Sequence, residues 1–266
     1  MPTAFRLPRP VVVLALAALV AGCGGGGDGG SPTSTPTPPT TPPSTPSGPP
    51  APSGSVGFLR GWAQGFVTTD NGVPTSVGVR LSVDVLNTTG FPNTSVIVPL
   101  PATPGLPFDH VQLDWNPMGH LPAGVYHDPH YDIHFFMISQ SARDRITLAD
   151  RDAMFRAVPS AMRPPGYSAD VTPFERMGIH WLDTTAPEFS GGRFTRTYIQ
   201  GFHDGAMIFG EPMITKAFLE TQPDVTTPIA QPATFPAPGR YPTRYRVRWD
   251  AATRTYEVTL EGLQPR

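Results

Sequence analysis

The residue types best suited to chemistry are crowded into one stretch, from His110 to Phe136. It reads HVQLDWNPMGHLPAGVYHDPHYDIHFF and holds five of the chain's seven histidines, with Asp114, Asp128 and Asp132 among them. Imidazole nitrogens and carboxylate oxygens are protein ligands for Zn, Fe and Mn. The stretch therefore predicts a metal site, with a hydrogen-bonded structural corner as the competing interpretation.

Residues His130 to His134 and the phenylalanines after them suit a β-strand, because aromatic and β-branched side chains recur there. On a strand His130, Asp132 and His134 share one face, and Tyr131 and Ile133 take the other. Neighbours on that face lie about 6.6 Å apart and the two histidines about 13 Å apart. Asp132 paired with either histidine is therefore the easier local ligand pair.

A short helix is the alternative for the same residues. Asp128 would cap this helix and Pro129 would take its first position. His130 and His134 would then be i,i+4 neighbours on one helical face, a spacing that suits Zn.

Further ligands must come from other parts of the chain. Three histidines and one carboxylate suit Zn, Fe or Mn and leave one coordination position open. These ligand types resemble those of cupin-type barrels, but the spacing departs from the cupin motif, so the likeness is one of analogy. Glu211 could equally be a buried hydrogen-bond acceptor, for backbone N–H groups or for Arg196, instead of a metal ligand. The predicted metal ligands are His120, His130, His134, His180 and Glu211, with Asp132 and Asp114 behind them orienting histidine rings.

Structural roles compete with metal binding at several histidines. His120 and His127 lie in a stretch with glycine and proline, where a histidine often fixes a loop by hydrogen bonding. His110 and His203 are predicted at the surface or in turns, since His203 directly precedes Asp204-Gly205. Besides metal binding and structural burial, metal-free general acid/base catalysis is a third possible role for the histidines of the predicted site.

Other reaction classes find no motif in this chain. It contains no G-x-S-x-G elbow, no P-loop, no G-x-G-x-x-G after a strand and no C-x-x-C-H. Cys23 and Lys216 are its only cysteine and lysine. The formal net charge of −2 does not favour a nucleic-acid partner. Whether the protein is an enzyme stays open; if it is, the metal would activate water or polarise a carbonyl.

The N-terminus predicts export and a lipid anchor. Residues 1–22 contain the apolar run VVVLALAALVA behind two arginines, which is too short to span a bilayer and is typical of a signal peptide. Val20-Ala21-Gly22-Cys23 resembles the lipobox of bacterial lipoproteins, so Cys23 is the predicted lipidation site. Residues 23–55 predict a disordered Gly/Pro/Ser/Thr-rich tether. The expected location is the cell envelope, with the lipid in the outer membrane or on the periplasmic face.

A single β-rich domain over residues 56–266 must position the candidate side chains. Apolar alternation predicts a mainly β (β-rich α+β) fold, a barrel-like or sandwich sheet domain with one or two short helices. Hairpin turns are predicted at Asn71-Gly72 and Asp204-Gly205. Helices are predicted at 147–158, capped by Thr147, and at 216–220. Strands are predicted at 59–67, 77–86, 95–100, 110–115, 131–138, 194–201 and 206–209, with a hairpin over 245–260.

Two blocks of the sequence carry a family resemblance. They are LDWNPMGHLPAGVYHDPHYDIHFF (113–136) and MGIHWLDTTAPEFSGGRFTRTYIQGFHDGAMIFGEPMITKAFLE (177–220). They resemble an uncharacterised family of bacterial exported domains, typified by a thermophile protein under an extracytoplasmic sigma factor. The likeness covers roughly residues 56–220. It implies that the five predicted ligands and Asp132 belong to the family pattern, and that His127 and His203 are peculiar to this chain.

Two other functions remain open at this point. A non-catalytic, oligomeric binding or assembly module of the envelope stress response would use its histidines structurally and work through an interface between copies. A small-molecule-binding barrel would line a pocket with Trp115, Phe136 and Trp181. The sequence determines neither the ligand nor the oligomeric state.

Overall fold

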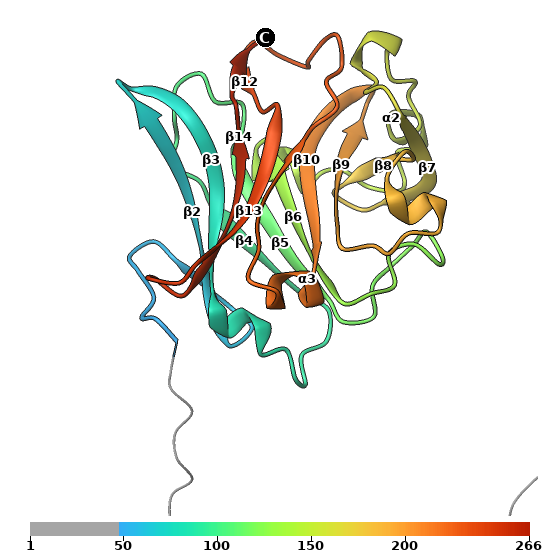
Figure 1. Ribbon diagram of the computed structural model, residues 1–266. Coiled ribbons are helices and arrows are strands. Elements are labelled where there is room, and N and C mark those ends of the chain that lie inside the picture. Colours follow the sequence, from blue (N-terminus) through green and yellow to red (C-terminus); the bar gives the residue numbers. More distant parts are fainter. Residues whose placement is uncertain (1–47) are drawn as a thin grey trace, which may run out of the picture. The chain divides into compact units, whose positions relative to one another are not determined.

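Two antiparallel β-sheets make up most of residues 48–266, the part of the chain that the computed structural model describes (Figure 1). Sheet A has the strand order β1 (Val56–Phe58), β2 (Gly61–Asp70), β3 (Val73–Ser82), β14 (Thr255–Glu261), β13 (Arg244–Asp250) and β11 (Asp224–Pro228). Sheet B has the order β4 (Thr94–Pro99), β5 (His110–Asn116), β6 (His130–Phe136), β10 (Ala206–Thr215), β9 (Arg196–His203), β8 (Gly178–Asp183) and β7 (Tyr167–Phe174). The mainly β prediction is confirmed, and neither sheet closes into a barrel.

Short elements connect and flank the sheets. Strands β12 and β15 pair with each other, and three short α-helices stand where one or two were predicted. These elements are β12 (Arg240–Tyr241), β15 (Gln264–Pro265), α1 (Gln140–Arg143), α2 (Arg151–Met154), α3 (Lys216–Glu220) and the 3-10 helices η1 (Val83–Leu86), η2 (Ser160–Met162) and η3 (Pro187–Ser190).

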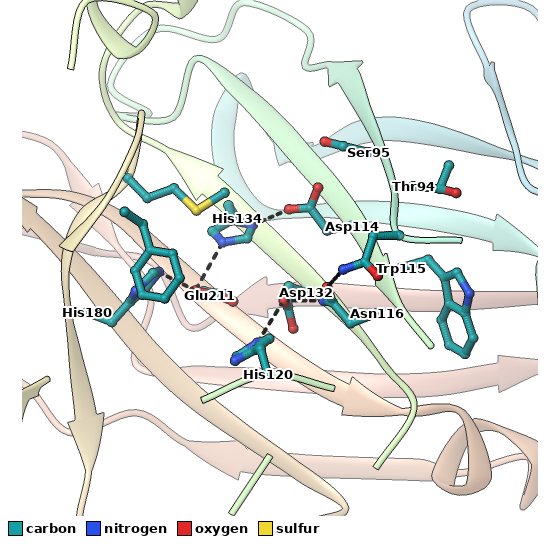
Figure 2. A pocket seen from close by; sticks show the side chains of 13 residues that line it. Thr94, Ser95, Asp114, Trp115, Asn116, His120, Asp132, His134, His180 and Glu211 are labelled. Carbon is teal, nitrogen blue, oxygen red and sulfur yellow. Dashed lines mark hydrogen bonds and ion pairs between the residues drawn. The ribbon is translucent and has the colours of Figure 1, made fainter. Parts of the chain in front are cut away.

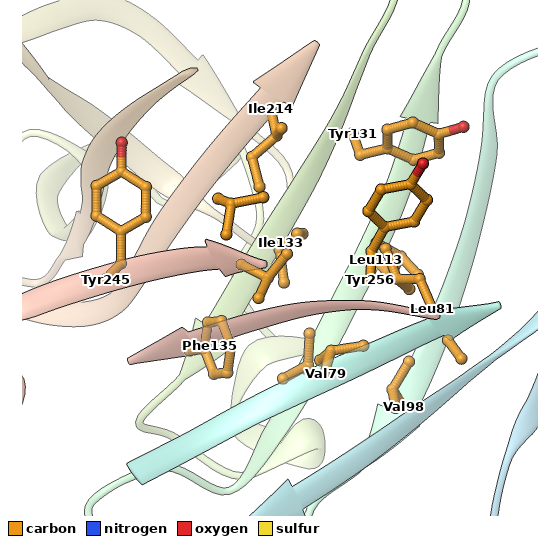
Figure 3. Packing of buried hydrophobic residues seen from close by; sticks show 14 of the residues in the cluster. Val79, Leu81, Val98, Leu113, Tyr131, Ile133, Phe135, Ile214, Tyr245 and Tyr256 are labelled. Atoms are coloured by element: carbon orange, nitrogen blue, oxygen red, sulfur yellow. The ribbon is translucent and has the colours of Figure 1, made fainter. Parts of the chain in front are cut away.

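A common core joins the facing sides of the two sheets (Figure 3). Ile133 and Phe135 of β6 are fully buried in the same cluster as Val79 and Leu81 of β3. Burying a side chain of this size stabilises the fold by about 1.5–3 kcal/mol. Because strand side chains alternate, these contacts fix which residues of β6 lie on the opposite face of sheet B.

The predicted hairpins are confirmed. Asn71 (φ 49°) and Gly72 (φ 78°) join β2 to β3, and Asp204 (φ 52°) and Gly205 (φ 76°) join β9 to β10. Positive φ at both central residues is what a two-residue type I′ turn requires, and Asn-Gly and Asp-Gly tolerate it best. The hairpin predicted over 245–260 is formed by β13 and β14.

The helix predicted at 147–158 is wrong in extent and in its cap. Only α2 is helical, and Asp150 caps it by accepting a hydrogen bond from the Ala153 N–H at 3.1 Å. The Thr147 hydroxyl instead accepts from the Ala149 N–H at 3.3 Å, which makes a turn. Pro159 disfavours helical backbone at Val158, but α2 ends before that point, with Phe155 (φ −107°, ψ 15°) as its C-cap. The helical turn predicted at 216–220 is confirmed as α3.

Other boundaries also differ from the predictions. Residues 83–86, predicted as the end of a strand, form η1. Strands β7, β8 and β11 were not predicted, because their apolar and polar residues do not alternate clearly over enough positions. The absence of a clear signal for β8 matters most, since this strand carries His180.

The predicted signal peptide, Cys23 and most of the predicted tether lie outside the described residues. Residues 48–55 of that tether form no helix or strand. They lie against the domain, where the Trp62 indole N–H donates to the Pro49 carbonyl at 2.9 Å. Among residues 48–266, no helix has the length and apolar character needed to span a bilayer.

Candidate metal centre

The candidate site lies on the face of sheet B that points away from the core (Figure 2). His130, Asp132 and His134 share this face of β6 and are all buried, as the strand interpretation predicts. The helix alternative is wrong. On the neighbouring strand β5, Asp114 lies opposite Asp132 and Asn116 lies opposite His130. Two adjacent strands thus present polar side chains to the same buried region.

The first group of candidate ligands, the His120 trio, consists of His120, His130 and Asp132. The His130 Nε2 atom lies 3.1 Å from Asp132 Oδ1, and the His120 Nε2 atom lies 3.2 Å from Asp132 Oδ2. The two rings also contact each other, with centroids 4.7 Å apart. One ligand atom from each member lies within 4.8 Å of the other two, a spacing that a single metal ion can bridge.

Asp132 is held in place by Asn116. The Asn116 side-chain amide donates to Asp132 Oδ2 at 2.6 Å and its oxygen accepts from the Asn93 amide at 3.1 Å. Burial alone would raise the pKa of Asp132, but the imidazoles of His130 and His120 outweigh it and hold that pKa below its ordinary value. The carboxylate is therefore present in its charged, ligating form.

The second group, the His180 trio, consists of His134, His180 and Glu211. The Glu211 Oε2 atom lies 3.3 Å from His134 Nε2 and 3.7 Å from His180 Nε2. All three side chains are at least nine-tenths buried. One ligand atom from each lies within 4.8 Å of the others, so this group also matches the span of a metal ion.

A glycine lets His180 reach its partners across an intervening strand. His180 on β8 lies opposite Gly201 on β9, and Gly201 lies opposite Phe209 on β10. A Cβ atom at Gly201 would lie 2.0 Å from the Phe209 ring. That ring packs edge-on against His134, at a centroid distance of 4.9 Å, and against His180, at 5.5 Å. Gly201 thus makes room for the aromatic side chain that separates and supports the two histidines.

Electrostatics differ among the members of the His180 trio. Burial lowers the pKa of His134, but Glu211 and Asp114 outweigh this effect and raise it to about 9. Burial raises the pKa of Glu211 to about 8, against the opposing charge of His134. Burial, together with the charge of His134, lowers the pKa of His180 to about 3. His180 is therefore neutral at physiological pH, the form in which a histidine can bind a metal ion.

Several buried polar atoms of the two trios lack hydrogen bonds within residues 48–266. They are His130 Nε2, Asp132 Oδ1, His134 Nδ1 and Glu211 Oε2. Leaving such an atom without a partner costs about 1–3 kcal/mol. Three of them point at another trio member at short distance without making a bond of good geometry. A metal ion is one species that can satisfy imidazole lone pairs and carboxylate oxygens together.

A cavity of about 320 Å³ gives both trios access to the outside. Its walls include Phe174 and Met177, and Thr94 and Ser95 lie at one side (Figure 2). Trp115 borders it only from β5, because its ring packs against Tyr131 in the core. No lysine or arginine lines it among the described residues. The cavity therefore combines an apolar wall with a floor of histidines and carboxylates, the usual make-up of a small-molecule site.

All five predicted ligands come together in the structure, but in two groups where the sequence predicted one. Asp132, predicted to orient a ring, is itself a member of the His120 trio. Asp114 lies where predicted, with Oδ2 at 3.2 Å from His134 Nδ1 and with two hydrogen bonds from the Gln112 amide. His127 accepts a hydrogen bond from the Gly124 N–H at 3.4 Å, in agreement with a loop role.

Three predictions about neighbouring residues are wrong. His110 is buried, not at the surface, because β5 places its ring flat on Phe136 at a centroid distance of 5.0 Å. Arg196 does not pair with Glu211; its guanidinium donates to the Thr227 hydroxyl at 3.3 Å. The aromatics Trp115, Phe136 and Trp181 do not line one pocket: Trp115 borders the candidate site and Trp181 borders a separate cavity.

Asn116 and Gly201 are the supporting residues that the sequence did not reveal. For Asn116 a signal was present, because Gln112, Asp114 and Asn116 repeat at every second position of a strand and so share one face. For Gly201 there was none, since its role depends on the pairing of β8, β9 and β10.

One comparison with known families gives a match. A family model described as "TTHB210-like: Hypothetical protein TTHB210" matches residues 69–115. It runs from the end of β2 to β5, so of the two trios and Asp114 it contains Asp114 alone. The chain is thus similar to an uncharacterised domain family over this segment. Comparisons with curated proteins and with solved structures found no match.

Proposed function

We propose that the domain is a metalloprotein of the cell envelope whose metal ion is held by His134, His180 and Glu211. Two histidines and a carboxylate form a common ligand set of catalytic zinc sites, in which the fourth position is left for water or substrate. All three side chains line the cavity, so a fourth position on an ion that they held would be accessible from it. The protein thereby presents a metal ion with an open coordination position to a small molecule.

The observation that carries this proposal is the unsatisfied Glu211 Oε2 atom. It is buried, makes no hydrogen bond within residues 48–266, and lies within 3.3–3.7 Å of two imidazole Nε2 atoms. A purely structural carboxylate at this depth would accept hydrogen bonds from backbone or side-chain N–H groups. The arrangement instead resembles a ligand set converging on a cation.

Supporting groups on β5 suit the same purpose. Asp114 faces the Nδ1 atom of His134 at 3.2 Å, and a carboxylate behind a histidine ligand orients the ring and strengthens its other nitrogen as a donor. Asp114 is itself held by the Gln112 amide. Zn, Fe and Mn fit this donor set. Such an ion would supply Lewis-acid chemistry, the activation of water or polarisation of a carbonyl.

The cellular setting of the proposal rests on the N-terminal sequence. The signal-peptide pattern of residues 1–22 and the lipobox before Cys23 favour an exported protein with a lipid anchor. The membrane would then be its partner through the lipid alone. The cavity's acidic floor, without lysine or arginine among the described lining residues, favours a neutral small-molecule substrate or one bound through the metal.

Cobalt substitution of the full chain, purified without a histidine tag or chelator, tests this function. Four-coordinate Co²⁺ absorbs strongly in the visible, and azide changes that spectrum where an open position exists. We expect a tetrahedral Co²⁺ spectrum that azide perturbs and that loses intensity in His180→Ala/Glu211→Gln. Absence of bound Co²⁺ and Zn²⁺ in the wild type would refute the proposal. His203→Ala, outside both trios, is the control.

A further inference from the structure

The His120 trio contains two buried polar atoms, His130 Nε2 and Asp132 Oδ1, that have no hydrogen-bond partner within the described residues. The His120 Nδ1 atom lies 2.7 Å from the Leu121 carbonyl oxygen, and the His130 Nδ1 atom lies 2.7 Å from the Asp128 carbonyl oxygen. A carbonyl oxygen only accepts, so both Nδ1 atoms carry the proton. In the neutral form in which histidine binds a metal ion, each ring then has its Nε2 lone pair available on the Asp132 side.

We propose that this trio is a second metal site, so that the cavity holds two divalent transition-metal ions. The proposal rests on the metal ion of the His180 trio and extends it. One ligand atom from each of the three residues lies within 4.8 Å of the others, and both Nε2 atoms lie 3.1–3.2 Å from the carboxylate. His130 Nε2 and Asp132 Oδ1 are both buried and have no hydrogen-bond partner within the described residues. Two histidines and one carboxylate again suit Zn, Fe or Mn.

The two trios belong to one centre. Asp132 and His134 are neighbours on the same face of β6, about 6.6 Å apart along the strand. His120, Asp132, His134, His180 and Glu211 all line the same cavity. Figure 2 shows His120 and Asp132 beside Glu211 and His134 in that cavity. A substrate bound there would reach both ions.

Charge balance also favours two ions. The cavity is lined by three carboxylates, Asp114, Asp132 and Glu211, and by no lysine or arginine among the described residues. With neutral histidines, one divalent ion would leave a formal charge of −1 and two would bring it to +1. A cavity with two ions, and so a net positive charge, can bind the negatively charged oxygen of a substrate or of an attacking water. Paired ions have this role in two-metal sites.

The expected ligand class follows from this balance. A small molecule with an oxygen-bearing, polarisable group, such as an ester, amide or phosphoester, would place its oxygen between the ions. Its remainder would contact the wall formed by Phe174 and Met177. The protein itself offers no basic side chain among the described lining residues for this group, so the ions must bind it.

Zinc stoichiometry of the full chain tests the second site. The probe is Zn²⁺, loaded in excess and removed from solution by gel filtration, with bound metal measured by mass spectrometry. We expect two Zn²⁺ per wild-type chain and one in His120→Ala/His130→Ala. We also expect one in His180→Ala/Glu211→Gln and two in His127→Ala, a control from the same loop as His120.

Other stoichiometries separate the two proposals. A single Zn²⁺ that survives His120→Ala/His130→Ala but is lost from His180→Ala/Glu211→Gln overturns the second site and leaves the proposed function standing. A single Zn²⁺ lost from either variant means that both trios serve one ion, which also overturns the second site. No Zn²⁺ in the wild type overturns both proposals.

A single substitution keeps the test valid if the double variants misfold. His120 is the only trio member outside a strand, and about a third of its side chain is exposed, so His120→Ala should fold. We expect Zn²⁺ to slow amide hydrogen exchange over residues 117–129 in the wild type and in His127→Ala, but not in His120→Ala. Equal protection of that segment in all three proteins would contradict the second site.

Discussion

Replacing Gly201 by alanine tests whether the packing under the candidate centre sets its geometry. The new Cβ atom would lie 2.0 Å from the Phe209 ring, and that ring is fully buried between His134 and His180. The ring cannot move without displacing at least one of the two histidines. The backbone itself tolerates alanine, since Gly201 is not among the residues with positive φ.

The expected magnitude has two parts. Overpacking of a buried site costs about 1–3 kcal/mol of the free energy of unfolding. For a domain of this size, 1 kcal/mol lowers Tm by about 2–4 °C, so the metal-free variant should melt roughly 2–12 °C below the wild type. Displacing a histidine should also weaken Zn²⁺ binding at the His180 trio. Loss of a residue that supports a metal ligand typically lowers metal affinity about 10–100-fold, and we expect a decrease of that size.

Thermal melts of the metal-free protein and competition with a zinc chelator measure the two parts separately. Gly210→Ala is the matched control, because its Cβ atom would lie 1.9 Å from the Tyr198 hydroxyl in the core between the sheets. It should lower Tm and spare Zn²⁺ affinity. Gly57→Ala, with no atom within 4 Å of the new Cβ, should change neither. Wild-type Zn²⁺ affinity in Gly201→Ala, or an equal loss in Gly210→Ala, would refute the reasoning.

Three further predictions concern the metal ions. Saturating Zn²⁺ at 100 times its Kd should stabilise the protein by about 2.7 kcal/mol, so EDTA should lower Tm in calorimetry; an unchanged Tm would count against metal binding. Asn116→Ala removes the 2.6 Å bond to Asp132 and should weaken the ion of the His120 trio about 10–100-fold, with the other ion unaffected in the same titration. The pKa of His120 and of His134 is raised to about 9, because neighbouring carboxylates outweigh burial. Zn²⁺ must therefore displace protons at pH 7, so its affinity should rise from pH 7 to 9 and then level off. A calorimetric affinity that is flat over that range would contradict the assigned ligands.

Local patterns made much of the fold predictable. The Asn-Gly and Asp-Gly turns, the alternation in β3, β5 and β6, and the helical turn of α3 depend on residues close in sequence. The helix at 147–158 was overpredicted because Asp150 competes with Thr147 for the cap. The strand β8 was missed because pairing with β7 and β9, not its own pattern, defines it.

The sequence by itself determined the chemistry that is available. It supplied the histidines and carboxylates, placed His130, Asp132 and His134 on one strand face, and excluded thiolate chemistry in the domain through its lone cysteine at position 23. These conclusions need only the period of a strand and the donor properties of side chains.

Only the tertiary structure decided how those residues are grouped. The order β5-β6-β10-β9-β8 brings Glu211 and His180 to His134, and the loop after β5 brings His120 to His130. The contact between His134 and Glu211 joins residues 77 positions apart, and His120 and Glu211, which line one cavity, are 91 positions apart. Strand order across a sheet depends on which apolar faces pack together, and no local pattern along one chain records it.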